Sequence, residues 1–335
     1  MSTPVTLIAG DGIGPEVVDA AVQVIDATGA SIEWQRAAAG AGAIAEHGTP
    51  IPQETLESVR KNKLALKGPL ATPIGEGYRS VNVALRKEFE LFANVRPART
   101  FAGVPTRYTD VNLVVIRENT QGAYSGVEHF VDEEHSAAES ISIITRKGSE
   151  RVVEHAFQYA IAHGRKQITL VHKANILKCT SGLFLEAGRA IAARHPTIGF
   201  REMIVDNCAM QLVKNPAQFD VIVTTNLFGD ILSDLTSGLI GGLGLTAGAN
   251  IGYSAAIFEA VHGTAPDIAG KGIANPTAVM LAGAMLLEHM GERKLGDKLG
   301  RAIREAIGSR EALTGDLGGS ATTKEFTESV LKRLH

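Results

Sequence analysis

The chain has 335 residues, 44% hydrophobic and 21% charged, which is enough for one large or two ordinary globular domains with a sizeable core. Its net charge of −3 and isoelectric point near 6.4 exclude the basic surface that binds nucleic acid or an anionic membrane. No uninterrupted apolar stretch approaches the roughly 18 residues that a membrane-spanning helix needs.

The cysteine content and the N-terminal residues bear on the compartment. Cys179 and Cys208 are too few to staple a fold of this size, which favours a reducing compartment. Residues 1–9 lead directly into the strand-like VTLIA and lack the order of charge and size found in a signal peptide. We therefore expect a cytoplasmic protein, although a mature organellar protein would have the same features.

Strand-like and helix-like segments alternate along the chain. Buried apolar or β-branched runs predict strands at 6–9, 112–116, 168–172, 198–205 and 220–225. Helical spacing of apolar residues, or a helix-starting proline, predicts helices from Pro15 and over 151–163, 184–195, 210–213 and 275–291. Such alternation predicts an α/β fold with a mostly parallel sheet and helices on both of its faces.

Residues 124–146, YSGVEHFVDEEHSAAESISIITR, differ from the rest of the chain. Their middle is acidic and their end alternates between polar and apolar residues. A two-stranded arm that reaches another subunit and an ordinary surface hairpin explain this pattern equally well.

The sequence Gly10-Asp11-Gly12-Ile13-Gly14 follows the first expected strand and is similar to a dinucleotide-binding fingerprint. Pro15 stands directly after the third glycine, and the acidic residue expected about twenty positions later corresponds only loosely to Glu33. A tight turn from strand to helix also requires glycines, so the motif gives weak support to a Rossmann fold.

Polar residues follow several expected strands: Arg117, Lys173, Asp206, Asp230 and Asp234. In open α/β sheets, ligands bind at the carboxyl ends of the strands, so these residues are candidates for one site. Exposed loops are polar in any case, and for a single residue that explanation is the better one. For the five together the two explanations are balanced.

Asp230 and Asp234 occur in NLFGDILSD, four residues apart. If a helix begins at Gly229-Asp230, the two carboxylates share one face and repel each other. A bound cation would offset this repulsion, and with Asp206 the two would form an all-oxygen site suited to Mg²⁺ or Mn²⁺. Taken singly, helix capping and solvation explain each aspartate.

Residues 75–100 hold a second candidate binding region. Ser80 is a plausible N-cap, Asn82 and Arg86 share one face of the helix that follows, and Arg96 lies in an expected NVRP turn. A helix N-terminus with several guanidinium groups binds carboxylates or phosphates well, and Arg117 adds another. The alternative is an ordinary amphipathic helix with a basic rim.

Residues 258–276, FEAVHGTAPDIAGKGIANP, have no apolar periodicity and predict a long ordered loop before a helix. Long loops in compact domains tend to be functional, but a structural loop is the alternative, and the loop alone identifies no cofactor. Asp267 in this loop is suited to accept hydrogen bonds from a ribose diol and to repel the phosphate of NADP.

In their order along the chain, these motifs resemble those of the β-decarboxylating dehydrogenases, which act on isocitrate, 3-isopropylmalate, homoisocitrate or tartrate. The resemblance covers essentially the whole chain: GDGIGPEV, NVRPART, VIRENTQGAYSGVEH, LVHKANILK, NLFGDILSDLTSGLIGGLGLTAGANIG and FEAVHGTAPDIAGKGIANP. The resemblance is strongest with the NAD-dependent isocitrate dehydrogenases. These enzymes bind the γ-carboxylate of isocitrate with a Ser and an Asn at the positions of Ser80 and Asn82. Isopropylmalate enzymes tend to carry bulky apolar residues there.

The resemblance implies roles for particular residues. It implies a set that binds the substrate carboxylates: Ser80, Asn82, Arg86, Arg96 and Arg117. It implies carboxylate ligands of Mg²⁺ or Mn²⁺: Asp206, Asp230 and Asp234. Tyr124 would protonate C3 after decarboxylation, and Lys173 with Asp206 would move the proton of the C2 hydroxyl. It implies a set that binds the cofactor: Thr72, His262, Gly263, Thr264, Ala265, Pro266, Asp267, Ile268 and Asn275. NADP-dependent relatives carry Lys-Tyr after HGTAP where this chain has Asp267-Ile268, so the implied cofactor is NAD.

The resemblance also implies an architecture and an activity. It implies the two-domain isocitrate/isopropylmalate dehydrogenase fold with a cofactor site outside a Rossmann fold. The large domain would comprise 1–91 and 242–335, and the small domain 92–241 with an arm at 122–146. In the family Lys173 and Asp206 reach the partner's site, so we expect a homodimer with intertwined arms, or a higher oligomer.

The expected reaction is oxidative decarboxylation of isocitrate to 2-oxoglutarate and CO₂, with hydride transfer to NAD⁺. The alternatives are another 2-hydroxy acid, such as homoisocitrate, 3-isopropylmalate, tartrate or malate, and a non-catalytic regulatory subunit. Regulatory subunits typically lose metal-binding or acid–base residues, and this chain retains them.

Overall fold

The computed structural model describes residues 2–71 and 80–334. The chain folds into two compact units. Unit 1 comprises Met1–Phe89, Thr100–Thr109 and Ser237–His335; unit 2 comprises Glu90–Arg99 and Asp110–Thr236. This division differs from the expected domain boundaries at three places: residues 100–109 and 237–241 belong to unit 1, and residues 90–91 belong to unit 2.

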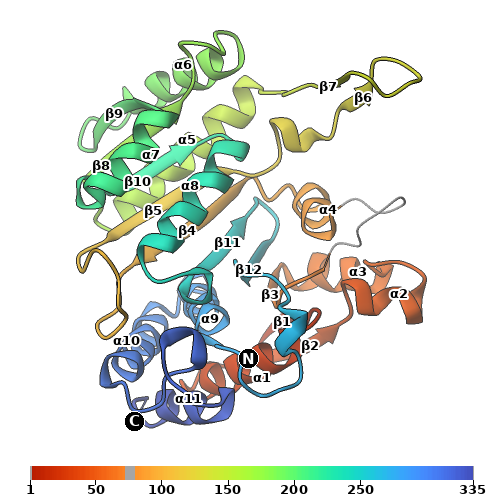
Figure 1. The fold of residues 1–335 in the computed structure, drawn as a ribbon, viewed down its shortest axis with the longest axis vertical. Helices are drawn as coiled ribbons and strands as arrows, with labels where there is room; N and C mark the ends of the chain where they lie inside the picture. Colours follow the sequence, from red (N-terminus) through yellow and green to blue (C-terminus); the bar gives the residue numbers. More distant parts are fainter. Residues whose placement is uncertain (1, 72–79, 335) are drawn as a thin grey trace. The chain divides into compact units, whose positions relative to one another are not determined.

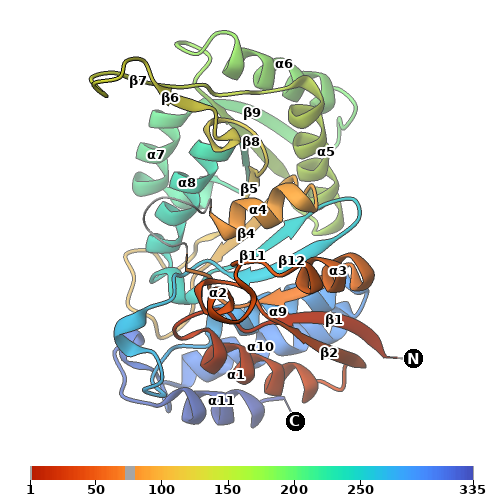
Figure 2. The same ribbon diagram turned by 90° about the vertical axis from the view of Figure 1, so that its right-hand side faces the viewer.

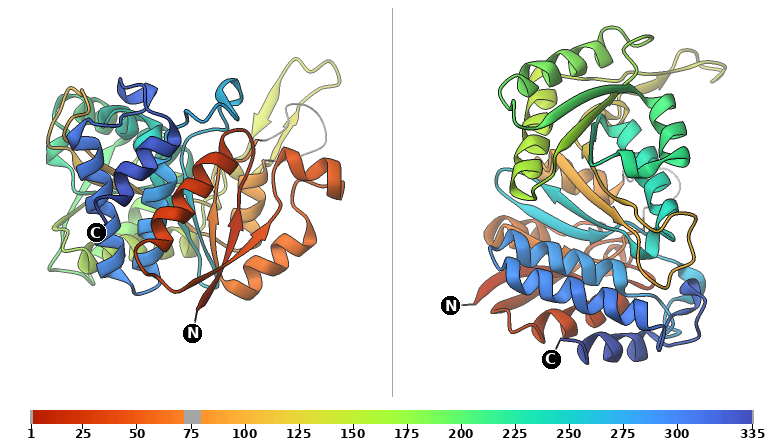
Figure 3. Two further views of the ribbon diagram at one scale, coloured as in Figure 1. Left: turned by 90° about the horizontal axis from the view of Figure 1, so that it is seen from below. Right: turned by 90° about the vertical axis from the view of Figure 1, so that its left-hand side faces the viewer.

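Unit 1 contains strands in the order β2-β1-β3-β12-β11, all parallel to their neighbours except β11, which runs antiparallel to β12 (Figure 1). The strands are β1 (Thr3–Ile8), β2 (Ile32–Ala37), β3 (Leu64–Lys67), β11 (Ala247–Ile251) and β12 (Ala256–Ala260). Its helices are α1 (Gly14–Asp26), α2 (Ala41–His47), α3 (Gln53–Asn62), α4 (Val81–Glu88), α9 (Thr277–His289), α10 (Arg293–Ser309) and α11 (Thr323–Leu331). Short 3₁₀ turns are η3 (Leu243–Leu245), η4 (Pro266–Ile268) and η5 (Gly315–Leu317). The left view of Figure 3 shows α1 and α9 to α11 on one side of these strands and α3 on the other.

Unit 2 contains strands in the order β4-β5-β10-β8-β9, parallel except for the antiparallel pair β4–β5. The strands are β4 (Ala93–Arg99), β5 (Asn112–Glu118), β8 (Gln167–His172), β9 (Gly199–Ile204) and β10 (Val221–Thr224). The helices are α5 (Arg146–Ala162), α6 (Thr180–Ala192), α7 (Val205–Lys214) and α8 (Asn226–Leu239), with short turns η1 (Ala123–Ser125) and η2 (Pro216–Gln218). Figure 2 shows α5 and α6 on one side of these strands and α7 and α8 on the other. The expected α/β fold with a mostly parallel sheet is therefore confirmed.

The strands form where the sequence supplies continuous apolar runs, because both faces of the sheet are covered by helices. In β5, residues Leu113, Val114, Val115 and Ile116 are all fully buried. Helix α1 begins at Gly14, with Pro15 in its first turn, as expected for a residue with no amide hydrogen to satisfy. These local signals position the ends of the strands, where the candidate site lies.

Three expectations about local structure are wrong. The NVRP segment is not a turn but part of β4, which pairs antiparallel with β5, and extended backbone accommodates the fixed φ of Pro97. Helix α8 starts at Asn226 rather than Gly229, because the amide of Gly229 already donates to the carbonyl of Thr225. Residues 258–260 are not loop but the end of β12, which is fixed by pairing with β3 and β11.

The arm residues form a two-stranded antiparallel ribbon, β6 (Glu128–Phe130) and β7 (Ala138–Ser140), which extends from unit 2 in Figure 1. Phe130, Val131 and Ile141 are 53%, 56% and 47% exposed. This ribbon with exposed apolar side chains agrees with both interpretations, an arm that contacts another subunit and a surface hairpin.

Cys179 is exposed and Cys208 is buried, and both are free thiols. Within residues 2–71 and 80–334, no helix has the length and apolar character needed to cross a bilayer.

Candidate active site

Two buried arginines lie side by side on the antiparallel pair β4–β5 of unit 2. Arg117 is 1% exposed and Arg96 is 5% exposed. Asn94 is directly opposite Arg117 in the register, so Asn94, Arg96 and Arg117 share one face of the sheet. The Arg96 Nε donates to Asn94 Oδ1 at 2.7 Å, which fixes this guanidinium beside its neighbour.

Helix α8 covers these arginines at very close range. A Cβ on Gly229 would lie 2.6 Å from both Cβ and Cγ of Arg117, so only glycine allows the helix to approach the strand so closely. Asn226, at the start of α8, accepts hydrogen bonds from Arg117 Nε and Nη2 at 2.9 and 2.6 Å. Ser233, two turns along, accepts from Arg96 Nη1 at 2.6 Å.

Tyr124 joins this cluster from the 3₁₀ turn η1. Its hydroxyl donates to Asp230 Oδ2, and the Arg117 guanidinium carbon lies 5.0 Å from the centre of its ring. Burial raises the pKa of Tyr124, and the hydrogen bond to the Asp230 carboxylate raises it further, although Arg117 partly offsets both. The phenol is therefore protonated at neutral pH and able to give a proton.

The two aspartates of α8 lie one turn apart, as the sequence indicated, and the structure shows what offsets their repulsion. Asp230 forms an ion pair with Arg117 and lies 3.8 Å from Arg96, while Asp234 lies 3.4 Å from Arg96. Burial raises the pKa of Asp234, the charge of Arg96 opposes this, and Asp230 raises the pKa again. Two buried guanidinium groups of the chain itself therefore offset part of the repulsion, and the bound cation stays a prediction.

Lys173 and Asp206 form a second pair in unit 2. Lys173 follows β8 and its Nζ lies 2.6 Å from Asp206 Oδ1 in the first turn of α7. The hydrogen bond from Lys173 lowers the pKa of Asp206, whose side chain is 69% exposed. The pair therefore faces solvent in the isolated chain.

The donor set suits a divalent cation only in part within one chain. Asp230 and Asp234 present carboxylate oxygens that are partly exposed, which fits a hard ion such as Mg²⁺ or Mn²⁺. Among the described residues no group of three or more His, Cys, Asp or Glu side chains is placed to hold a metal, so Asp206 does not join the other two in the same chain.

In unit 1, Arg86 belongs to a buried charge network that the sequence did not reveal. Glu259 on β12 is directly opposite Lys67 on β3, and its carboxylate lies 2.8 Å from Lys67 Nζ and 3.5 Å from Arg86 Nη2. Asn250 Nδ2 donates to the same carboxylate at 2.8 Å. Burial would raise the pKa of Glu259, but the charges of Lys67 and Arg86 and the two hydrogen bonds outweigh it and bring the pKa to about 2.

Ser80 and Asn82 lie at the start of α4. Ser80 is the N-cap residue, but in the described part of the chain its hydroxyl does not cap a first-turn amide, so the capping prediction is wrong. Asn82 Oδ1 is buried and has no hydrogen-bonding partner among the described residues. A buried polar atom without a partner, one helical turn from the buried Arg86, is typical of a site that binds a polar ligand.

Most of the predicted cofactor residues line one cavity of about 560 Å³ in unit 1. The predicted residues on its wall are His262, Gly263, Ala265, Ile268 and Asn275. Thr264, Pro266 and Asp267 are in the same loop but do not line the cavity, and Thr72 lies outside the described residues. The volume and the largely apolar wall are typical of a small-molecule site.

Two polar groups on this wall can orient a ligand. His262 Nδ1 donates to the carbonyl of Gly263 at 2.9 Å, which leaves Nε2 as an acceptor. That atom is buried, has no partner within the described ranges, and belongs to a ring that burial keeps neutral by lowering its pKa. Asn275 Nδ2 donates at 2.9 Å to Asp316, an acidic wall residue contributed from near the C-terminus.

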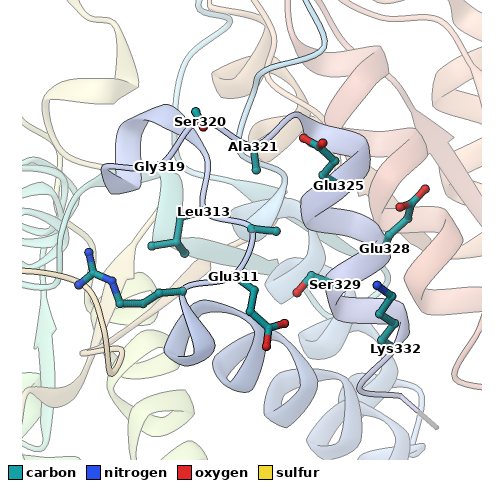
Figure 4. A pocket seen from close by; sticks show the side chains of 11 residues that line it. Glu311, Leu313, Gly319, Ser320, Ala321, Glu325, Glu328, Ser329 and Lys332 are labelled. Carbon is teal, nitrogen blue, oxygen red and sulfur yellow. The ribbon is translucent and has the colours of Figure 1, made fainter.

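A second cavity of about 500 Å³ is lined by α11 and by the segment between α10 and α11 (Figure 4). Glu311, Glu325, Glu328 and Lys332 are on its wall, and it shares Ser320 and Ala321 with the first cavity. Glu311 pairs with Arg333 and Glu325 caps α11, so these two carboxylates have structural roles already. The chemistry of this cavity points to no particular ligand.

The sequence missed several residues that hold the predicted ones: Lys67, Asn94, Asn226, Ser233, Asn250, Glu259 and Asp316. Asn226 alone carried a usable signal, since it stands directly after a strand within NLFGDILSD. The others become visible only through strand register or long-range packing.

The sequence matches the isocitrate/isopropylmalate dehydrogenase family over residues 4–330. It is 51% identical over 336 residues to an Arabidopsis thaliana mitochondrial protein named isocitrate dehydrogenase [NAD] catalytic subunit 5, covering 99% of this chain and 89% of the relative. It is 52% identical over 303 residues to a chloroplastic 3-isopropylmalate dehydrogenase of Solanum tuberosum, covering 90% and 84%.

Among solved structures, isocitrate dehydrogenase from Methylococcus capsulatus has a TM-score of 0.96 and 59% identity, covering 100% of this chain and 99% of that one. The match in sequence and in fold extends over the residues that form both candidate sites. The chain belongs to the isocitrate/isopropylmalate dehydrogenase family.

Proposed function

We propose that this protein is an isocitrate dehydrogenase that oxidatively decarboxylates isocitrate to 2-oxoglutarate and CO₂ and transfers a hydride to NAD⁺. One observation carries the proposal: Tyr124, Asp230 and Arg117 meet as a proton donor, a carboxylate and a buried cation. This combination can bind an anionic substrate and deliver a proton beside it, which a simple binding module does not require.

The substrate-binding part of the proposal rests on arginines. Arg96 and Arg117 are buried and held by Asn94 and Asn226, so their guanidinium groups are fixed before the substrate binds. Fixed guanidinium groups bind carboxylates bidentately at little entropic cost. Within unit 1, Ser80, Asn82 and Arg86 are proposed to bind substrate carboxylates, with Ser80 and Asn82 reading the γ-carboxylate, as the family resemblance implies.

The reaction needs proton movements at two positions. Lys173 and Asp206 together move the proton of the C2 hydroxyl as hydride leaves C2 for NAD⁺. Loss of CO₂ then leaves electron density at C3, and the raised pKa of Tyr124 keeps its proton available for C3. A Mg²⁺ or Mn²⁺ ion held by Asp230, Asp234 and Asp206 would supply Lewis-acid polarisation of the substrate oxygens.

The 560 Å³ cavity is proposed to bind the adenosine part of NAD⁺. The Nε2 of His262, which has no partner among the described residues, and the carboxamide of Asn275 are groups that hydrogen-bond a base or a ribose. The acidic Asp267 and Asp316 disfavour a ligand with an additional phosphate, so NAD is the proposed cofactor rather than NADP.

The active protein is proposed to be at least a homodimer, because among the described residues Asp206 forms no metal-binding group with Asp230 and Asp234 within a single chain. Apolar residues on α7 and α8 support this: Met210, Val213, Leu227 and Ile231 are 49%, 41%, 43% and 59% exposed. The exposed arm ribbon would complete the contact between subunits. A relative named as a catalytic subunit raises the alternative that this chain works with a second type of subunit.

Mixing inactive subunits tests the shared site. Lys173→Met and Tyr124→Phe chains should each be inactive, but co-expression should restore about a quarter of the activity, because half of the dimers then contain one intact site. Separately purified chains that are never mixed are the control. No recovery in dimers shown to contain both chains would contradict a site built across subunits.

The compartment is proposed to be reducing, since both cysteines are free. The comparisons do not support the cytoplasmic expectation, because the NAD-dependent relative is named as mitochondrial. Reducing conditions are shared by the cytosol and the mitochondrial matrix, and both are compatible with the proposed chemistry.

The rival proposals concern the substrate and the catalytic role. Identity of 52% to a 3-isopropylmalate dehydrogenase means that overall similarity does not decide the substrate, so Ser80 and Asn82 must. A regulatory subunit is disfavoured because the residues needed for catalysis are present: Tyr124, Lys173, Asp206, Asp230 and Asp234.

The decisive measurement is the initial rate of the purified chain with Mn²⁺ and isocitrate, homoisocitrate or 3-isopropylmalate, each with NAD⁺ and with NADP⁺. Fast NADH formation from isocitrate alone supports the proposal. Preference for another acid would overturn the role of Ser80 and Asn82, and inactivity with every pair would favour the regulatory subunit.

A further inference from the structure

The turn from Gly10 to Glu16 has glycines that resemble a dinucleotide fingerprint. It can affect cofactor binding without contacting the cofactor, because it holds a loop of the cavity in position. It lies beneath the loop between β12 and α9 that forms much of the 560 Å³ cavity. That loop has only the short turn η4 as secondary structure of its own, so its position depends on ties to other segments.

The first tie is at the near end of the loop. The amide of Ile13 donates to the carbonyl of Thr264 at 2.9 Å. Gly12 has φ of +61°, and a Cβ there would lie 2.1 Å from the same carbonyl oxygen. The glycine is therefore required by close contact with the cavity loop, and Ile13 itself is on the cavity wall.

The second tie is at the far end and depends on Glu16. Its carboxylate accepts hydrogen bonds from the amides of Ala274 and Gly272 at 2.9 and 3.2 Å. The hydroxyl of Thr323, at the start of α11, also contacts this carboxylate and lies 2.6 Å from the carbonyl of Ala274. One carboxylate thus fixes both the backbone before Asn275 and the start of α11.

We propose that Glu16 is a positioning residue for the dinucleotide: it holds Ile273 and Asn275 in the arrangement that binds NAD⁺ without touching the cofactor. The inference rests on the proposed function, since it concerns the same cavity. Without this tie, the binding-competent arrangement would be only one of several that the loop adopts. The apparent affinity falls in proportion to that fraction.

The test is Glu16→Gln. The carboxamide keeps one acceptor oxygen but turns an NH₂ group toward backbone amides that also donate, so at least one tie is lost. We expect faster hydrogen exchange at 272–275 in the absence of cofactor. We also expect an increase of about tenfold in the Kd and KM for NAD⁺, with kcat and the KM for isocitrate within about twofold.

Two further variants make the test specific. Asp19→Asn is the matched control, because Asp19 is an exposed acidic residue of the same helix that pairs with Arg36. It should change neither the hydrogen exchange nor the NAD⁺ affinity. Thr323→Val removes the hydroxyl at the same tie and should give an effect in the same direction that is not additive with Glu16→Gln.

The outcomes distinguish this inference from the proposed function. If the original protein binds NAD⁺ and Glu16→Gln binds it equally well, the positioning role is overturned while the function stands. If exchange at 272–275 rises but the original protein does not bind NAD⁺, the function and the role of Glu16 in it are both overturned. A parallel loss of kcat and of all affinities would show a general folding role and overturn the inference.

Discussion

Replacing Glu259 by Gln should destabilise unit 1 severely, because this carboxylate is the anion between two buried cations. The substitution keeps the shape of the side chain but leaves Lys67 and Arg86 without a counter-charge. A pKa of about 2, against an ordinary value of 4.5, corresponds to a stabilisation of about 3 kcal/mol at neutral pH. The carboxylate is buried, so no discount for solvent screening applies, and about 3–5 kcal/mol is typical for breaking a buried ion pair.

The same pKa fixes the pH dependence. Because the folded-state pKa lies below the unfolded-state value, the stabilisation is fully present above pH 4.5 and is lost as the pH falls toward 2. The difference in unfolding free energy between the original protein and Glu259→Gln should therefore be constant from pH 7 to 5 and shrink below that. Urea unfolding at a series of pH values measures this difference.

The control for this prediction is Glu305→Gln, an exposed residue of α10. It should change the unfolding free energy by less than about 0.5 kcal/mol. Adding Lys67→Met to Glu259→Gln should cost less than the sum of the two single changes, because one unpaired cation is removed. The reasoning is refuted if Glu259→Gln costs no more than the control or if the difference grows as the pH falls.

Three further changes follow from the geometry. Tyr124→Phe keeps the ring that packs on Arg117 but removes the proton, so kcat should fall by about 10²–10⁴ with little change in the KM for isocitrate; a loss under threefold in steady-state rates would contradict the acid role. In Arg117→Lys, the single ammonium group cannot contact Asn226 and Asp230 at the same time, so the unfolding free energy should fall by about 2–4 kcal/mol. An unchanged midpoint in urea titrations would contradict this structural role of Arg117. Gly12→Ala places a methyl group against Thr264 at positive φ and should raise the KM for NAD⁺ more than that for isocitrate; equal effects on both would argue against a local displacement.

The sequence predicted the parts of this protein that local patterns encode. The buried run at 112–116 and the helix that begins beside Pro15 are fixed by their own residues, and the structure confirms both. Asp230 and Asp234 could be assigned to one helical face from their spacing alone.

The remainder depends on pairings that no local window contains. Lys67 and Glu259 are opposite each other only because β3 and β12 pair, although they lie far apart in the sequence. The residues NVRP alone predict a turn at Arg96, because no local pattern shows that this segment pairs antiparallel with β5. Asp316 reaches Asn275 from near the C-terminus through packing between segments that are far apart in the sequence.

The contact between Gly229 and Arg117 couples the two positions: a substitution at one limits which residues the other can accept. A side chain added at Gly229 would overlap the aliphatic part of the buried Arg117 side chain. Relieving this overlap moves α8 away from β5, and Asp230 and Asp234 move with the helix. Conversely, a smaller residue at position 117 leaves a void under the helix that a larger residue at position 229 can fill. A mutagenesis library that varies only one of these positions yields mostly variants that pack poorly. A library that varies 117 and 229 together tests how far the two carboxylates can be displaced with the helix.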